Sequence, residues 1–233
     1  AFPSSVVVGC TTAGEITSGK MMKNSIVAMA FSATTLFDAK AVVLQKISEG
    51  NPVSQAMKIF ESYYDQLVLY MEQRDYVGII LADGLSGAEE KLMDAIGNLT
   101  NVSFIGGSAG DDAKFQTTYV YAGGKAYTDA AVLLLMKPCG EFGIIKTQSF
   151  CPLSNKLVAT KVDEKNREVL EFNNKPALLA YAEAIGSSAD DASNHFMHNP
   201  VGLMADEEPY VRSPQQVIGD KIKFYCNIKE GME

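Results

Sequence analysis

Apolar residues fall into two patterns along this chain. Short runs rich in β-branched residues predict strands, because they are too short for helices and are bounded by turn residues. In the first half these runs occupy 6–8, 25–32, 39–45, 76–82 and 102–105. Apolar residues at helical spacing predict helices that begin at Asn51-Pro52 and at the capping-box sequence Ser86 to Glu89, the second ending near Gly97.

The order of these elements indicates the sheet type. A strand, a capped helix and a second strand between Tyr76 and Ile105 form a βαβ unit, which pairs its strands in parallel. Gly123-Gly124 then separates two strand-like runs, which predicts a tight antiparallel hairpin. We therefore expect an α+β fold with mixed, largely antiparallel sheets and covering helices.

The second half repeats the mixture of short strands and one helix. Lys137 to Gly140 interrupts the pattern, so we expect two subdomains, 1–137 and 138–233. A helix is predicted to follow Asn173 to Pro176 and to end at Gly186. Strands are predicted at 142–150, 157–163, 169–172, 201–204, 210–212 and 221–226.

Composition narrows the classes of function. The chain of 233 residues is 47% hydrophobic with a net charge of −8, and no basic cluster is present that would neutralise several phosphates. We therefore expect no nucleic-acid partner. Apolar runs are too short to span a bilayer, so no membrane partner is expected. Four scattered cysteines fit neither a zinc site nor a disulfide framework, which favours the cytoplasm.

The stretch from Gly9 to Glu15 follows a predicted strand and carries a varied set of reactive groups. Glycines at both ends let successive N–H groups converge on an anion, as in a backbone nest. The hydroxyls are further donors, and the carboxylate suits a ligand amine. The alternative is a plain turn with Cys10 as a small core residue. Candidate ligand-binding residues here are Gly9, Cys10, Thr11, Thr12, Gly14 and Glu15.

A second stretch, Gly106 to Asp112, has a similar character and also follows a predicted strand. It lacks the Lys-Ser/Thr ending of a P-loop and the context of a dinucleotide fingerprint, so neither motif indicates a nucleotide site. Its carboxylates either recognise an ammonium group or simply turn the chain. We expect the two stretches to form one small-molecule site, to which this one contributes Gly106, Gly107, Ser108, Gly110 and Asp111.

Three further residues are candidates for ligand contact. Arg212 lies among apolar residues, where its guanidinium either grips a ligand carboxylate or remains exposed on an edge strand. His195 and His198 are the only histidines and stand three apart. No Cys lies near them, and they do not form a His-Glu-x-x-His motif, so neither common metal motif is present. A metal site, a hydrogen bond to an anionic ligand and haem ligation are the alternatives.

Four ordered stretches together resemble the FIST family of sensory domains. Gly9-Cys10-Thr11-Thr12-Ala13-Gly14-Glu15-Ile16 and Gly106 to Asp111 are similar to its two signature stretches, with Thr11 where serine is more usual. Glu171 to Ala177 and Pro209 to Arg212 resemble its C-terminal region. The resemblance implies an N-terminal FIST region over 1–137 and a C-terminal one over 138–233, each truncated at its outer end.

The resemblance implies a cytoplasmic, bacterial signal-transduction domain that binds a small ligand, such as an amino acid or another small carboxylate. It also implies a signalling partner in trans, such as a kinase, a cyclic-dinucleotide enzyme or a chemotaxis protein. We expect no catalysis and no cofactor. The alternatives are a haem-based nitric oxide sensor using His195 or His198 and a hydrolase dependent on Cys10.

Overall fold

The computed structural model describes residues 4–50, 52–112, 114–205 and 208–233. The chain divides into two compact units, residues 1–145 and residues 146–233. Each unit is described by itself below. The fold is α+β, with several mostly antiparallel sheets and helices, which confirms the predicted class.

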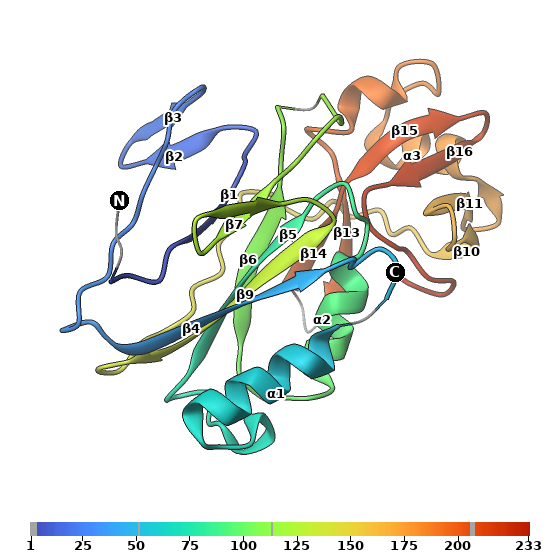
Figure 1. Ribbon diagram of the computed structural model, residues 1–233. Coiled ribbons are helices and arrows are strands. Elements are labelled where there is room, and N and C mark those ends of the chain that lie inside the picture. Colours follow the sequence, from blue (N-terminus) through green and yellow to red (C-terminus); the bar gives the residue numbers. More distant parts are fainter. Residues whose placement is uncertain (1–3, 51, 113, 206–207) are drawn as a thin grey trace. The chain divides into compact units, whose positions relative to one another are not determined.

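The first unit is built on a mixed sheet with the strand order β4-β9-β5-β6 (Figure 1). Its strands β5 and β6 are parallel and are joined through helix α2, so the predicted βαβ unit is confirmed. Strand β9 pairs antiparallel with both neighbours and is buried along most of its length. The strands are β4 (Leu36–Gln45), β5 (Val77–Asp83), β6 (Phe104–Ala109) and β9 (Ala130–Pro138).

Both faces of this sheet are covered, which explains the unbroken apolar run in β9. Ala131, Leu133 and Leu135 point to one face, where they pack in a cluster with helices α1 (Val53–Tyr64) and α2 (Glu89–Gly97) (Figure 1). Ala130 and Val132 point to the other face and pack with the sheet β1-β7-β8. That second sheet comprises β1 (Val8–Cys10), β7 (Val120–Ala122) and β8 (Lys125–Tyr127).

The predicted glycine hairpin in the first unit is confirmed. Gly123 and Gly124 both have positive φ, at 58° and 77°, and form the turn between β7 and β8. The remaining elements are the hairpin β2 (Glu15–Thr17) and β3 (Lys20–Met22) and the 3-10 helix η1 (Val68–Tyr70). Asn51, the predicted N-cap, lies outside the described residues; Pro52 occupies the N-cap position.

The second unit holds a sheet in the order β10-β11-β16-β15, with β12 added to β11, and a separate hairpin of β13 and β14. Helix α3 ends at Gly186 with φ 69°, as predicted. Its elements are β10 (Ala159–Asp163), β11 (Glu168–Phe172), β12 (Lys175–Pro176), α3 (Ala177–Ile185), η2 (Ala192–His195), β13 (Val201–Ala205), β14 (Glu208–Arg212), β15 (Pro214–Ile218) and β16 (Lys221–Phe224).

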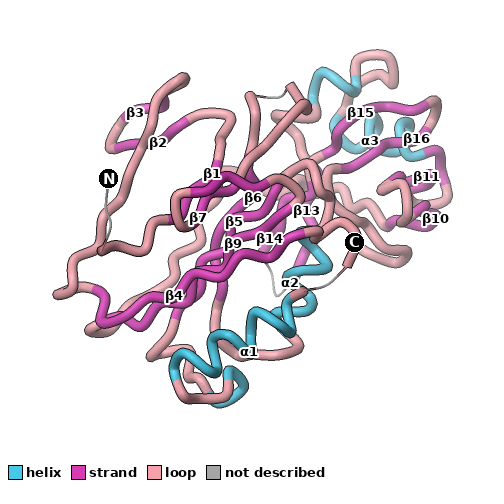
Figure 2. Tube along the Cα trace, in the orientation of Figure 1, coloured by secondary structure: helices cyan, strands magenta, loops and turns pink. Residues whose placement is uncertain are grey.

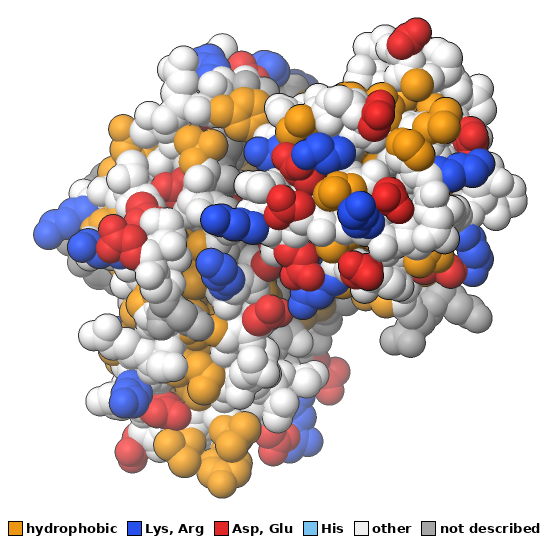
Figure 3. Space-filling view, turned by 90° about the vertical axis from the view of Figure 1, so that its right-hand side faces the viewer, with side chains coloured by type: hydrophobic (Ala, Val, Ile, Leu, Met, Phe, Trp, Pro, Cys, Tyr) orange, Lys and Arg blue, Asp and Glu red, His pale blue; other side chains and the backbone are white. Residues whose placement is uncertain are grey.

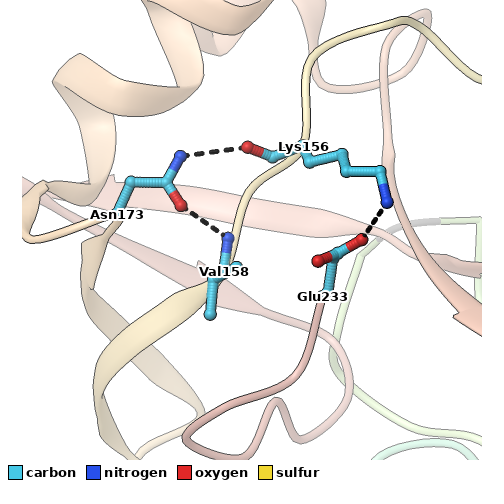
Figure 4. Close-up of polar contacts among 4 residues, drawn as sticks. All are labelled: Lys156, Val158, Asn173 and Glu233. Carbon is cyan, nitrogen blue, oxygen red and sulfur yellow. Dashed lines mark hydrogen bonds and ion pairs between the residues drawn. The ribbon is translucent and has the colours of Figure 1, made fainter.

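One asparagine fixes the chain beside β10 in this unit (Figure 4). The Asn173 side chain accepts a hydrogen bond from the Val158 amide at 2.9 Å and donates one to the Lys156 carbonyl at 3.0 Å. The Lys156 ammonium in turn contacts the Glu233 carboxylate at 2.5 Å. These contacts hold the segment before β10 against the β11–β12 turn.

Four predictions about individual elements are wrong. Residues 25–32 and 142–150 are not strands. The stretch Gly106 to Ala109 belongs to strand β6 and not to a loop. Helix α2 begins at Glu89 without a side-chain cap, since the Ser86 hydroxyl accepts from the Ala88 amide instead.

The face drawn in Figure 3 carries acidic and basic side chains that are interspersed, with apolar side chains between them. None of the described helices is both long and apolar enough to cross a membrane.

Candidate functional site

The first signature stretch leaves strand β1 and is held against the chain just before β7. The Thr11 amide donates to the Tyr119 carbonyl at 2.9 Å, and the Tyr119 amide donates back to the Thr11 hydroxyl at 3.0 Å. Two segments more than 100 residues apart are thereby fixed side by side. Thr11 and Tyr119 both line the cavity described below.

Glu15 closes this stretch and is already engaged by its own chain. Its carboxylate accepts from the Thr12 hydroxyl at 2.7 Å and from the Ser25 hydroxyl at 2.7 Å. The hydrogen bond from Ser25, together with that from Thr12, lowers the Glu15 pKa. The side chain therefore stays ionised and ties the β2 strand to the segment that follows β3.

The second signature stretch divides into a strand and a loop. Gly106 is required by the sheet, because a Cβ atom there would lie 1.8 Å from the Ile80 carbonyl oxygen of β5. The Ser108 hydroxyl donates to Glu89 of helix α2 at 2.9 Å. Gly106, Gly107 and Ser108 thus lie within β6, and they are not among the residues that line the pocket.

The two stretches nevertheless meet, at Gly110. Its amide donates to the Thr11 carbonyl at 3.0 Å, and a Cβ atom on Gly110 would approach the Ala13 nitrogen to 3.0 Å. Beside this contact lies an open cavity of about 350 Å³. Its lining comprises Thr11, Thr12, Ala13, Gly14, Glu15, Lys23, Asn24, Gly110, Asp111, Asp112, Lys114, Gln116, Thr117 and Tyr119.

Two aspartates of the pocket are also held by their own chain. Asp111 accepts from the backbone amides of Phe115, Gln116 and Thr117, at 2.9, 2.6 and 3.1 Å. The Gln116 amide contributes most to lowering the Asp111 pKa. The Asp112 carboxylate lies 2.7 Å from the Lys23 ammonium, which lowers its pKa as well. Both carboxylates are therefore ionised, and both shape the loop.

Five other side chains that line the pocket are not held in this way. Among the described residues they form no hydrogen bond or ion pair through their side chains, which leaves one cation, two amides and two hydroxyls for a ligand. They are Asn24, Lys114, Gln116, Thr117 and Tyr119. Sequence reasoning did not select these five residues, because each comes from a segment without a motif.

Cys10 lies outside the pocket lining. It pairs with Val120 in the β1–β7 ladder and packs, half-buried, against the core beneath that sheet. Burial raises the pKa of its thiol, which is the opposite of what a nucleophilic cysteine needs. Gly9 shares this strand, opposite Tyr121.

Arg212 and the histidines belong to the second unit. Arg212 ends strand β14 opposite Val201, and it lines a small cavity of about 20 Å³ in that unit. Its Nε atom is buried and has no hydrogen-bond partner among the described residues. His195 ends η2 with its Nε2 3.0 Å from the Asp191 carboxylate. No cluster of three or more metal-ligating side chains is present in the described ranges.

Comparison with known proteins identifies the family. The FIST N domain matches residues 1–175, three quarters of the chain. This chain belongs to the FIST family. FIST domains form a sensory family of signal transduction. The match includes both signature stretches and continues past the first unit.

One curated relative matches the chain and is itself uncharacterized. An uncharacterized protein of Methanocaldococcus jannaschii, MJ1623, is 23% identical over 192 residues. The alignment covers 79% of this chain and 36% of the relative, so the chain spans about a third of that protein's length. No solved structure matches the chain.

Proposed function

We propose that this FIST domain senses a small amino acid or another small carboxylate in the pocket beside Gly110. The observation that carries the proposal is the meeting of the two signature stretches, at the Gly110–Thr11 hydrogen bond, on the wall of one polar cavity. A cavity of about 350 Å³ is within the range of small-molecule sites.

The charges in the cavity suit a ligand with both signs. Lys114 is the cation without an ion-pair partner among the described residues, so it is available to a ligand carboxylate. Glu15, Asp111 and Asp112 keep their negative charge because their pKa values are lowered. A ligand ammonium near these carboxylates would be stabilised by their charge without displacing the backbone bonds.

Binding without chemistry is the activity we propose. The raised pKa of Cys10 and its place outside the pocket lining argue against its use as a nucleophile. A signalling protein acting in trans would read the bound state. A role for Arg212 in the same site, and a C-terminal FIST region over 138–233, remain predictions.

A thermal-shift screen of free amino acids and short carboxylates tests the proposal. A ligand at 100 times its Kd adds roughly 2.7 kcal/mol to the free energy of unfolding. The Lys114→Met variant removes the pocket cation and should weaken binding about tenfold or more, as expected for a lost hydrogen bond to a charged group. Lys125→Met is the matched control, since Lys125 lies in β8 outside the pocket lining.

Two results would contradict the proposal. One is a screen in which no compound raises the melting temperature. The other is a ligand that binds the two lysine variants equally well, because its site would then lie elsewhere.

A further inference from the structure

Residues 25–32, between β3 and β4, form an apolar segment that runs as a long loop in the first unit (Figure 2). Its sequence, Ser-Ile-Val-Ala-Met-Ala-Phe-Ser, is typical of a strand. Its large side chains are nevertheless exposed: Ile26 by 92%, Met29 by 80% and Phe31 by 50%. The segment therefore has the composition of a buried strand without the burial.

The backbone of this segment is unpaired in its middle and held at its ends. Residues 26–31 make no hydrogen bond to any described residue. At one end the Ser25 amide and hydroxyl donate to Glu15, at 3.3 and 2.7 Å. At the other end the Ser32 carbonyl accepts from the amides of Thr35 and Leu36, at 2.9 and 3.0 Å. The backbone N–H and C=O groups of residues 26–31 are therefore unpaired, while the segment is held at both ends.

This segment lacks the charged residues and prolines that normally prevent an open strand from pairing with another chain. Proteins usually place charges or proline on an open strand edge, because unpaired backbone invites another chain. Here no charged residue and no proline occurs from Asn24 to Phe37. Lys23 and Asp38 bound this uncharged stretch, with opposite charges at its two ends.

We propose that residues 25–32 pair with the same segment of a second copy of the chain, as antiparallel strands about a two-fold axis. With the axis between Ala28 and Met29, Ser25 of one copy faces Ser32 of the other, and Ile26 faces Phe31. Hydroxyl pairs and aromatic–aliphatic pairs are favourable cross-strand neighbours. The sequence is therefore self-complementary in this register.

The antiparallel arrangement places the end of one segment that precedes Ser25 beside the end of the other that follows Ser32. A two-fold antiparallel pair uses the same strand edge of each copy, so the proposed interface is isologous. This inference does not depend on the ligand proposed above.

Light scattering after gel filtration tests the inference with the unliganded chain. The mass should rise from 25.2 kDa toward twice that value as protein concentration increases. Hydrogen exchange at residues 26–31 should slow over the same concentrations, because pairing protects their amides. The Met29→Glu variant should raise the dimer dissociation constant by at least about tenfold, since it removes apolar burial from both copies and places two like charges near the axis.

Met21→Glu is the matched control. Met21 is 82% exposed in β3, outside the segment, so its substitution makes the same change of charge and apolar area without touching the pair. A chain that stays monomeric at all concentrations would overturn the inference. So would a dimer that Met29→Glu leaves intact, or one in which exchange at residues 26–31 stays fast.

Discussion

At the scale of single residues, the pocket contains two kinds of polar group. The carboxylates of Glu15, Asp111 and Asp112 each contact donors of their own chain, so they fix the loops that line the pocket. Lys114 and the neutral side chains beside it are uncommitted among the described residues. The carboxylates were predictable from the sequence because they stand within the signature stretches. Lys23 and Lys114 were not, since only the fold brings them to the same cavity.

Asp111 gives the pocket loop a defined pH dependence. Three backbone amides bond its ionised form, so its pKa in the folded state lies below the unfolded value of about 3.9. A depressed pKa contributes stability above the unfolded pKa, and that contribution is lost as pH falls through the folded pKa. Asp111→Asn should therefore be less stable than the parent chain at pH 6, with the difference shrinking below about pH 4.

Urea denaturation of both proteins between pH 6 and pH 2.5 measures this difference directly, and the other acidic groups cancel in the comparison. If the two stabilities differed by the same amount at every pH, the backbone amides would not be binding the charged form of Asp111.

At the scale of elements, the sequence predicted strands wherever apolar runs were short, and it succeeded where a partner exists. Strands β5 and β9 are buried between layers, so their composition and their pairing agree. Residues 25–32 are similarly apolar and residues 142–150 are less so, yet neither stretch is a strand. The local sequence pattern indicates that a segment can form a strand. Whether another strand lies beside it depends on the rest of the fold.

Strand β6 illustrates the same limit for glycine. Its glycines suggested a loop, yet Gly106 serves the close approach of β6 to β5. Gly106→Ala should therefore destabilise the first unit, because the new Cβ atom would lie 1.8 Å from the Ile80 carbonyl oxygen. We expect a loss at or above the upper end of the roughly 1–3 kcal/mol that overpacking costs.

Gly107→Ala is a close control for this variant, since a Cβ atom there meets nothing within 4 Å. Its stability should remain within about 0.5 kcal/mol of the parent chain. Chemical denaturation followed by circular dichroism measures both. Equal effects of the two substitutions would show that the β5–β6 contact is not what Gly106 provides.

At the scale of the whole molecule, each unit has its own hydrophobic core. The first unit contains the clusters on the two faces of its main sheet, and the second contains one cluster around α3, β11 and β16. Phe172, Tyr181 and Phe224 of that second cluster are almost fully buried. Separate cores predict separate cooperative units, even though the FIST match continues from the first unit into the second.

Phe224→Ala tests this organisation. Phe224 is fully buried and packs edge-to-face on Phe172, so its truncation should cost the second unit about 3–5 kcal/mol. Hydrogen exchange should then accelerate in β10, β11 and β16 while β5 and β9 keep their protection. Leu133→Ala, in the core of the first unit, should reverse the pattern. If either substitution accelerated exchange in both units alike, the chain would unfold as one cooperative whole, and the two cores would act as one.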